Sequence, residues 1–168
     1  MIALMVQLGG IDSQAFLLGR VIPAIKEPTR PLRAAVEALR DFARIQFEGG
    51  GSPIRWAPLK PSTIKARQRG YGIYKRPHVG GLSDPLHWSG DLKLSAMGLG
   101  PKGITKVGVE DGLPANQALI GSLDKVLFYH VMGLVRGVPE REVYPAPEAD
   151  DAATDAFEDR LGEVLEES

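Results

Sequence analysis

The spacing of hydrophobic residues along the chain predicts two amphipathic helices. Over residues 31–48 apolar side chains recur every three or four positions and charged side chains lie between them. The apolar positions of this segment are Leu32, Val36, Leu39, Ala43 and Phe47. Residues 148–168 show the same spacing at Ala153, Phe157, Leu161 and Val164 or Leu165. Three glycines at 49–51 predict the end of the first helix.

Shorter apolar runs predict the extended segments. Residues 2–8 alternate and indicate a strand, which a Gly-Gly pair separates from a helix over about 12–25. Residues 104–109 alternate in the same way, and 141–144 indicates a short final strand. Residues 126–132 form an apolar run that fits a strand or a short buried helix equally well.

The middle of the chain reads as a long loop with little regular structure. The sequence holds 20 glycines and 13 prolines, well above average usage, and most of the glycines fall in the middle. Within a loop over 49–90, residues 62–69 predict one or two helical turns with Ser62 as the N-cap. Residues 91–97 predict another short helix after the loop.

These elements predict one α+β domain over residues 1–168, with no repeat and no second domain. We expect a small, mainly antiparallel sheet packed against helices. An N-terminal strand and helix occupy 1–28, an extended basic loop 49–90, and an acidic C-terminal helix 148–168. No apolar run approaches the ~20 residues that cross a bilayer, so we expect no membrane partner.

The net charge of −1 hides a strong separation of charge along the chain. Residues 148–168 hold nine acids and one base, a net charge of −8. The remaining 147 residues hold 19 bases and 12 acids, a net charge of +7. The near-neutral total argues against a general nucleic-acid coat protein, whereas the separation indicates local acidic and basic surfaces.

The positive charge is concentrated in the predicted loop. Residues 49–82 contain no acid, and Trp56, Tyr71 and Tyr74 lie among their basic residues. The basic residues are Arg55, Lys60, Lys65, Arg67, Arg69, Lys75 and Arg76. Such a segment binds either nucleic-acid phosphates, with rings for stacking, or an acidic protein surface. We expect these seven residues to contact a partner, with a protein favoured over DNA.

Catalytic and metal-binding motifs are not found in the sequence. There is no cysteine, and the three histidines, His78, His87 and His130, lack metal-ligand spacing. His130 could form a triad with Ser89 and Asp91, but the Gly-x-Ser-x-Gly turn that exposes a nucleophile is missing. We therefore expect no catalytic residue, no metal and no cofactor. A small hydrolase or nuclease remains an alternative.

Five segments in order carry a resemblance to a known family. They are WAPLKPSTI at 56–64, LHWSGDLKLS at 86–95, VGV at 107–109, YHVMG at 129–133 and VPERE at 138–142. The set resembles the phage virion morphogenesis family, the tail-completion and neck proteins of tailed phages. Tyr129 directly precedes His130 here, whereas two further residues usually separate the family's Y-A pair from its histidine.

The resemblance implies structural rather than catalytic roles for the matching residues. These are Trp56, Leu59, Ser89, Gly90, Leu92, Tyr129, His130, Gly133, Pro139 and Arg141. It also implies a virion protein at the head–tail junction, in which a ring of subunits, most often six, caps the tail so that the head can join. The implied partners are further copies of the chain, the tail tube and the head-closure or connector proteins. The implied location is the virion, and the host cytoplasm during assembly.

Two alternatives bind nucleic acid. One is a head-closure or connector protein whose basic loop contacts DNA in the channel. The other is a free-standing nucleic-acid-binding module, whose affinity for duplex DNA would fall steeply with salt.

Overall fold

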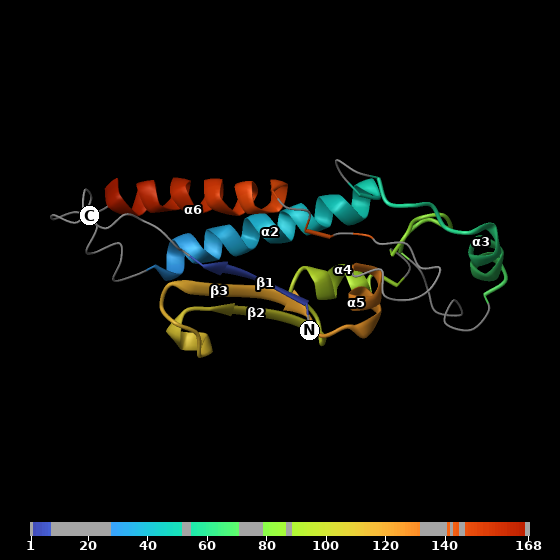
Figure 1. The fold of residues 1–168 in the computed structure, drawn as a ribbon, viewed down its shortest axis with the longest axis horizontal. Coiled ribbons are helices and arrows are strands. Elements are labelled where there is room, and N and C mark those ends of the chain that lie inside the picture. The colour runs from blue at the N-terminus through green and yellow to red at the C-terminus, as the bar shows by residue number, and fades with distance from the viewer. Residues whose placement is uncertain are drawn as a thin grey trace.

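The computed structural model describes three antiparallel strands and the helices around them (Figure 1). The described residues are 28–51, 55–70, 79–86, 89–131, 141, 143–144 and 147–166, with the backbone of 2–7. The strands β1 (Ile2–Gln7), β3 (Gln117–Ser122) and β2 (Gly103–Val107) lie side by side in that order. Ile120 in the central strand pairs with Leu4 on one side and Thr105 on the other. The predicted α+β class is confirmed.

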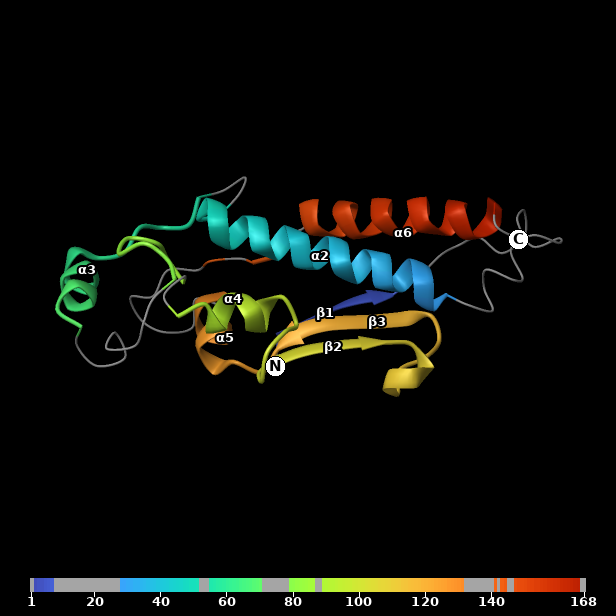
Figure 2. The ribbon, with the colours of Figure 1, turned by 180° about the vertical axis from the view of Figure 1, so that it is seen from behind.

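Two long helices pack against each other, and one of them lies on the sheet. The helices α2 (Thr29–Gly49) and α6 (Glu148–Glu166) pack against each other, and α2 also contacts β2 and β3 (Figures 1 and 2). The buried residues shared by the two helices and the sheet are Leu32, Ala35, Val36, Leu39, Val107, Ala118, Ile120, Ala149, Ala153 and Phe157. The apolar faces that the sequence predicted for both helices are therefore the faces that form the core.

A second core lies at the C-terminal end of α2. The short helices α4 (Asp91–Ala96) and α5 (Lys125–Val131) meet the end of α2 there. Its buried members are Ala43, Phe47, Trp56, Leu86, Ala96, Leu127 and Val143. Tyr144 packs against both cores and donates a 2.5 Å hydrogen bond to the carbonyl oxygen of Ala96. Burial raises the pKa of the Tyr144 phenol, which therefore stays a neutral donor.

An extended segment begins and ends in the second core, at Trp56 and Leu86, and reaches away from both cores between them. We call residues 55–70 and 79–86 the arm; it contains the helix α3 (Pro61–Gln68). In both views α3 lies beyond the C-terminal end of α2, whereas α6 runs toward the opposite end of the molecule (Figures 1 and 2). None of the helices that the structure describes is both long and apolar enough to cross a membrane.

Several local predictions differ from the structure. The central strand β3 was not predicted at all. The predicted strand at 141–144 is wrong at Arg141, Val143 and Tyr144, which belong to no strand. The predicted cap at Ser62 is also wrong, because Lys60 is the N-cap of α3 and Pro61 takes the first helical position. The apolar run at 126–132 fitted a strand or a short helix, and its described residues, up to Val131, belong to helix α5.

The strand predicted over 104–109 ends at Val107, because Gly108 takes a φ of +63° and begins a 3-10 turn over Val109–Asp111. The helix predicted over 12–25 lies outside the described residues, as do the family-matching Gly133 and Pro139.

Candidate functional site

The arm presents four basic side chains to solvent. Arg55, Lys60, Lys65 and Arg69 are exposed, and none of them forms an ion pair within the part of the chain that the structure describes. Lys60 precedes Pro61, whose fixed φ suits the first turn of α3. The described residues of 55–70 contain no acid. Residues 55–70 are therefore a local surface of uncompensated positive charge, and the returning segment 79–86 contains a single acid, Asp84.

Arg67 differs from its basic neighbours because it is buried. Only 6% of its surface is exposed. Its Nη1 donates hydrogen bonds to the carbonyl oxygens of Gly81, Leu82 and Asp84, at 3.3, 3.1 and 2.8 Å. These bonds tie α3 to the returning segment of the arm. The expectation that Arg67 contacts a partner is corrected, since its guanidinium stabilises the arm from within. Lys75 and Arg76 lie outside the described residues.

Aromatic packing anchors the arm to the second core. The Trp56 ring is buried and meets Phe47 edge to face, with ring centroids 5.2 Å apart and planes at 87°. Leu92 and Leu127 belong to the same cluster. Leu59 follows on the arm and is half-buried. The start of the arm is therefore fixed to the end of α2, and α3 projects from a rigid base.

Arg141 joins three segments at this base. Its Nη2 donates to the carbonyl oxygen of Ala57 at 2.9 Å, and its backbone N–H donates to the carbonyl oxygen of His130 at 2.9 Å. Its Nη1 lies 3.1 Å from Nδ1 of His130. Burial, followed by repulsion from Arg67, lowers the pKa of Arg141. We call Trp56, Ala57, His130 and Arg141 the arm root. It unites three of the five segments that carry the family resemblance.

His130 is a neutral acceptor in the arm root. Burial, followed by the positive charge of Arg141, lowers the pKa of its ring to about 4. At neutral pH the uncharged Nδ1 can accept a hydrogen bond from the guanidinium. Neither Ser89 nor Asp91 bonds to this ring in the described structure. The triad considered from the sequence is therefore not assembled.

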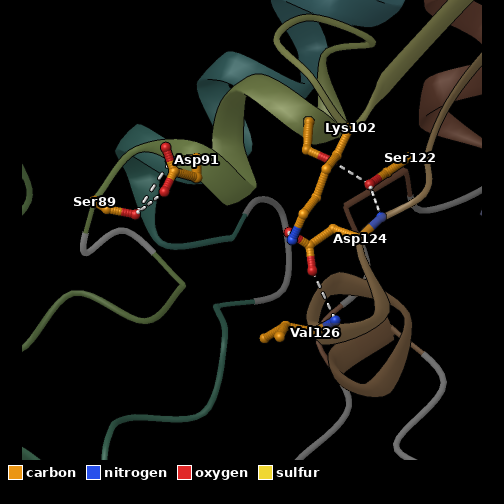
Figure 3. Close-up of polar contacts among 7 residues, drawn as sticks. Ser89, Asp91, Lys102, Ser122, Asp124 and Val126 are labelled. Atoms are coloured by element: carbon orange, nitrogen blue, oxygen red, sulfur yellow. Dashed lines mark hydrogen bonds and ion pairs between the residues drawn. The ribbon is translucent and has the colours of Figure 1, made fainter. Parts of the chain in front are cut away.

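The turns before the two short helices are fixed by local polar contacts (Figure 3). Gly90 is the N-cap of α4, with a φ of +84°, a conformation that favours glycine. The Ser89 hydroxyl donates to an Asp91 carboxylate oxygen at 2.8 Å and accepts from the Asp91 N–H at 3.4 Å. These two side chains bond to each other, and no side chain caps the start of α4.

A second polar group begins α5 (Figure 3). Asp124 is buried, and its Oδ1 accepts from the Val126 N–H at 2.9 Å, as in a helix cap. Its Oδ2 contacts Nζ of Lys102 at 2.8 Å, and its own N–H donates to the Ser122 hydroxyl at 2.9 Å. Ser122 also makes a short contact with the Ser95 hydroxyl. The group connects the ends of β3 and α4, and sequence reasoning did not find it.

The exposed face of α6 is strongly acidic. Its eight described acids are all exposed. They are Glu148, Asp150, Asp151, Asp155, Glu158, Asp159, Glu163 and Glu166. Within the described parts of the chain, only Glu163 has an ionic partner, Arg160. By contrast, the charges of α2 compensate one another or pair with nearby elements, as in Arg44 with Asp41 and Glu48.

Comparisons with known proteins add no relative to this description. The chain matches no family model, no curated protein and no solved structure. Within the described residues, no group of three or more His, Asp or Glu side chains is arranged to hold a metal ion. The candidate functional features of the described structure are the arm, the arm root and the acidic face of α6.

The neutral state of His130 predicts a pH dependence of stability. An unfolded histidine has a pKa near 6.5, whereas that of folded His130 is about 4. Between these values the unfolded chain binds a proton that the folded chain does not, so the free energy of unfolding falls as the pH falls. Solvent weakens this effect because the ring is partly exposed. With that reduction included, we expect the free energy of unfolding to fall by about 1–2 kcal/mol.

Denaturant titrations at about pH 7 and pH 4.5 measure this loss. A His130→Gln variant keeps a possible acceptor for Arg141 and cannot titrate, so it should lose less stability over the same interval. Equal losses in the two proteins would assign the pH dependence to the carboxylates instead.

Proposed function

We propose that the chain is a ring subunit of a structural assembly at the head–tail junction of a tailed phage. In this proposal it completes or caps the tail so that the head can join. Neighbouring subunits meet through two different surfaces. The arm of one subunit contacts the acidic face of α6 on the next subunit. Such a heterologous contact closes into a ring when the rotation between subunits divides a full turn.

The distribution of unpaired charge carries the proposal. Four exposed bases of the arm lack ionic partners among the described residues, as do seven of the eight described acids of α6. The arm and the C-terminal end of α6 lie toward opposite ends of the molecule (Figure 1). A surface at one end therefore complements a surface at the other, and identical subunits can associate head to tail.

The resemblance to phage virion morphogenesis proteins supports the choice of assembly. Its WAPLKPSTI, YHVMG and VPERE segments meet at the arm root through Ala57, His130 and Arg141. Leu92, from a fourth segment, packs in the same cluster as Trp56. These residues hold the arm in place, as expected of a scaffold that presents a docking surface.

Neutralising the acidic face of α6 should weaken self-association. The variant Asp155→Asn, Glu158→Gln, Asp159→Asn removes three exposed, unpaired charges and leaves the buried face of α6 intact. Truncating the helix would be a poorer test, because Phe157 belongs to the core. We expect the dissociation constant at low salt to rise at least about tenfold, as measured by light scattering or sedimentation.

A matched control removes three exposed carboxylates elsewhere, with Glu37→Gln, Asp41→Asn and Glu110→Gln. It should assemble like the natural protein. Salt near 1 M should also dissociate the natural oligomer, because the screening length falls to about 3 Å. An oligomer whose mass is insensitive to both salt and the α6 substitutions would contradict the proposed contact.

A further inference from the structure

The two ends of the arm are attached to the second core in different ways. We call residues 55–60 the outgoing leg and residues 79–86 the return leg. The Trp56 N–H donates to the carbonyl oxygen of Gly50 at 2.7 Å, and the Trp56 ring packs edge to face on Phe47. The buried guanidinium of the arm root also binds a carbonyl oxygen of this leg. Backbone and side-chain contacts together therefore fix the outgoing leg.

The return leg has fewer attachments. Among the described residues, no backbone hydrogen bond joins positions 81–86 to another element, because the Asp84 N–H donates within the leg, to the carbonyl oxygen of Gly81. Three carbonyl oxygens of the leg accept from Nη1 of Arg67, which has two hydrogens for three acceptors. The side chain that the leg places in the second core is that of Leu86. One guanidinium and one leucine are thus the chief attachments of positions 81–86.

The leucine attachment is strained. Leu86 has a φ of +59°, and every other described residue with a positive φ is a glycine. This left-handed conformation is unfavourable for a bulky side chain. Only 6% of Leu86 is exposed, so its burial opposes the strain. The free energy lost to such strain and the free energy gained by burying one leucine are of the same order. Leu86 therefore adds little net stability to the closed position of the return leg.

Charge also disfavours the closed position. Arg67 and Arg141 are both buried, with 6% and 3% of their surfaces exposed, and Nε of Arg141 has no hydrogen-bond partner. Burial first, and then the charge of Arg67, lowers the pKa of Arg141. The one acid of the return leg, Asp84, accepts from the Gly81 N–H and forms no ion pair with either arginine. Like charges that are buried near each other raise the free energy of the closed arm.

The closed return leg also sets the direction of the basic face of α3. Lys65 and Arg69 are four residues apart and share one face, whereas Arg67 points to the other side, toward the return leg. While the bonds of Arg67 hold, the two exposed bases keep a fixed direction. A surface that is ordered in advance binds a complementary surface more tightly than one that must be ordered on binding.

We propose that the return leg is a latch, which opens in the free subunit and is held closed when the arm docks on the acidic face of α6 of the next subunit. In the open state Leu86 leaves the second core and Arg67 loses its carbonyl acceptors, while the outgoing leg stays attached. Docking stabilises the closed state because that state presents Lys65 and Arg69 in their binding positions. Opening concerns the single chain, whereas closing on docking rests on the proposed function.

Hydrogen exchange tests both halves of this inference. The amides of Gly81 and Asp84 are hydrogen-bonded in the closed leg, and that of Trp56 is bonded in the outgoing leg. In the α6 variant with three neutralised acids, at a concentration where it is monomeric, the first two should be at least about tenfold less protected than Trp56. In the natural oligomer their protection should rise at least about tenfold, while that of Trp56 stays the same.

Three leucine variants test the latch without changing charge. Leu86→Ala removes the attachment and keeps the strain, whereas Leu82→Ala truncates a side chain of the same leg that is 37% exposed. We expect Leu86→Ala to weaken self-association at low salt at least about fivefold, and Leu82→Ala to match the natural protein. Leu86→Gly should recover part of the loss, because glycine adopts a positive φ without strain. Circular dichroism checks that each variant is folded.

Equal protection of the three amides in the monomer would overturn the inference. So would a natural oligomer in which Gly81 and Asp84 exchange as fast as in the monomer, or equal self-association by folded Leu86→Ala and Leu82→Ala. In these cases the ring proposal still stands. If the natural protein forms no oligomer, the ring proposal fails and closing on docking fails with it, while faster exchange of the return leg in the free chain still supports opening.

Discussion

Two charge-reversed variants should form together an oligomer that neither forms alone. The first carries Lys60→Glu, Lys65→Glu and Arg69→Glu, so both its arm and its α6 are acidic. The second carries Asp155→Lys, Glu158→Lys and Asp159→Lys, so residues 155–160 of its α6 become basic, as its arm already is. Each alone opposes like charges at every contact. Mixed in equal amounts, each arm meets an α6 of opposite charge, and the two chains alternate.

The expected effect is large because three pairs of charges change sign at once. At low salt we expect each variant alone to be monomeric, and the mixture to recover most of the oligomer mass, measured by light scattering. All six positions are exposed and unpaired within the described chain, so each variant should retain its fold. Circular dichroism of the separate variants checks this. A mixture of two folded variants that stays monomeric would contradict the contact between arm and α6.

The largest effect on stability is expected from Phe157→Ala. The Phe157 side chain is only 6% exposed and joins α6 to the core that α2 shares with the sheet. Removing a buried phenyl ring loses its transfer free energy and leaves a cavity, which together cost about 3–5 kcal/mol. Because domains of this size are stable by only about 5–15 kcal/mol, the variant should be near its folding limit.

Denaturant unfolding measures this loss. Glu158→Ala is the matched control, since Glu158 is the next residue and is exposed. The control should change the free energy of unfolding by no more than about 0.5 kcal/mol. A loss below about 1 kcal/mol for Phe157→Ala would mean that α6 contributes little to the core.

The long helices were predictable because their patterns are local. In α2 and α6 the residues that face the core, such as Phe47 and Phe157, recur at helical spacing in the sequence. The strand β3 was missed because Gln117–Ser122 lacks a clear alternation of apolar and polar residues. It carries an apolar Leu119 between the buried Ala118 and Ile120, and its partners come from distant parts of the chain.

The sequence was enough to predict a basic segment at the candidate site. It was not enough to predict which of its basic side chains are buried or which groups they contact. Sequence alone does not distinguish Arg67 from Lys65, two residues earlier on the same short helix. Arg67 is buried because the chain returns and brings the carbonyl oxygens of residues 81–84 within its reach. The contact between His130 and Arg141 likewise depends on how the chain returns to the end of α2. Such contacts need the tertiary structure.

The two buried arginines also affect how freely the arm can evolve. Arg67 and Arg141 bind carbonyl oxygens of Gly81, Leu82, Asp84 and Ala57, and every amino acid supplies such an oxygen. Substitutions at Leu82 and Ala57 can therefore preserve the bonds as long as the backbone path is kept. Gly81 and Asp84 are less free, because the Asp84 carboxylate accepts from the Gly81 N–H and a Cβ on Gly81 would lie 2.9 Å from it. The arm could exchange its surface residues, and with them its binding specificity, while keeping the same attachment to the fold.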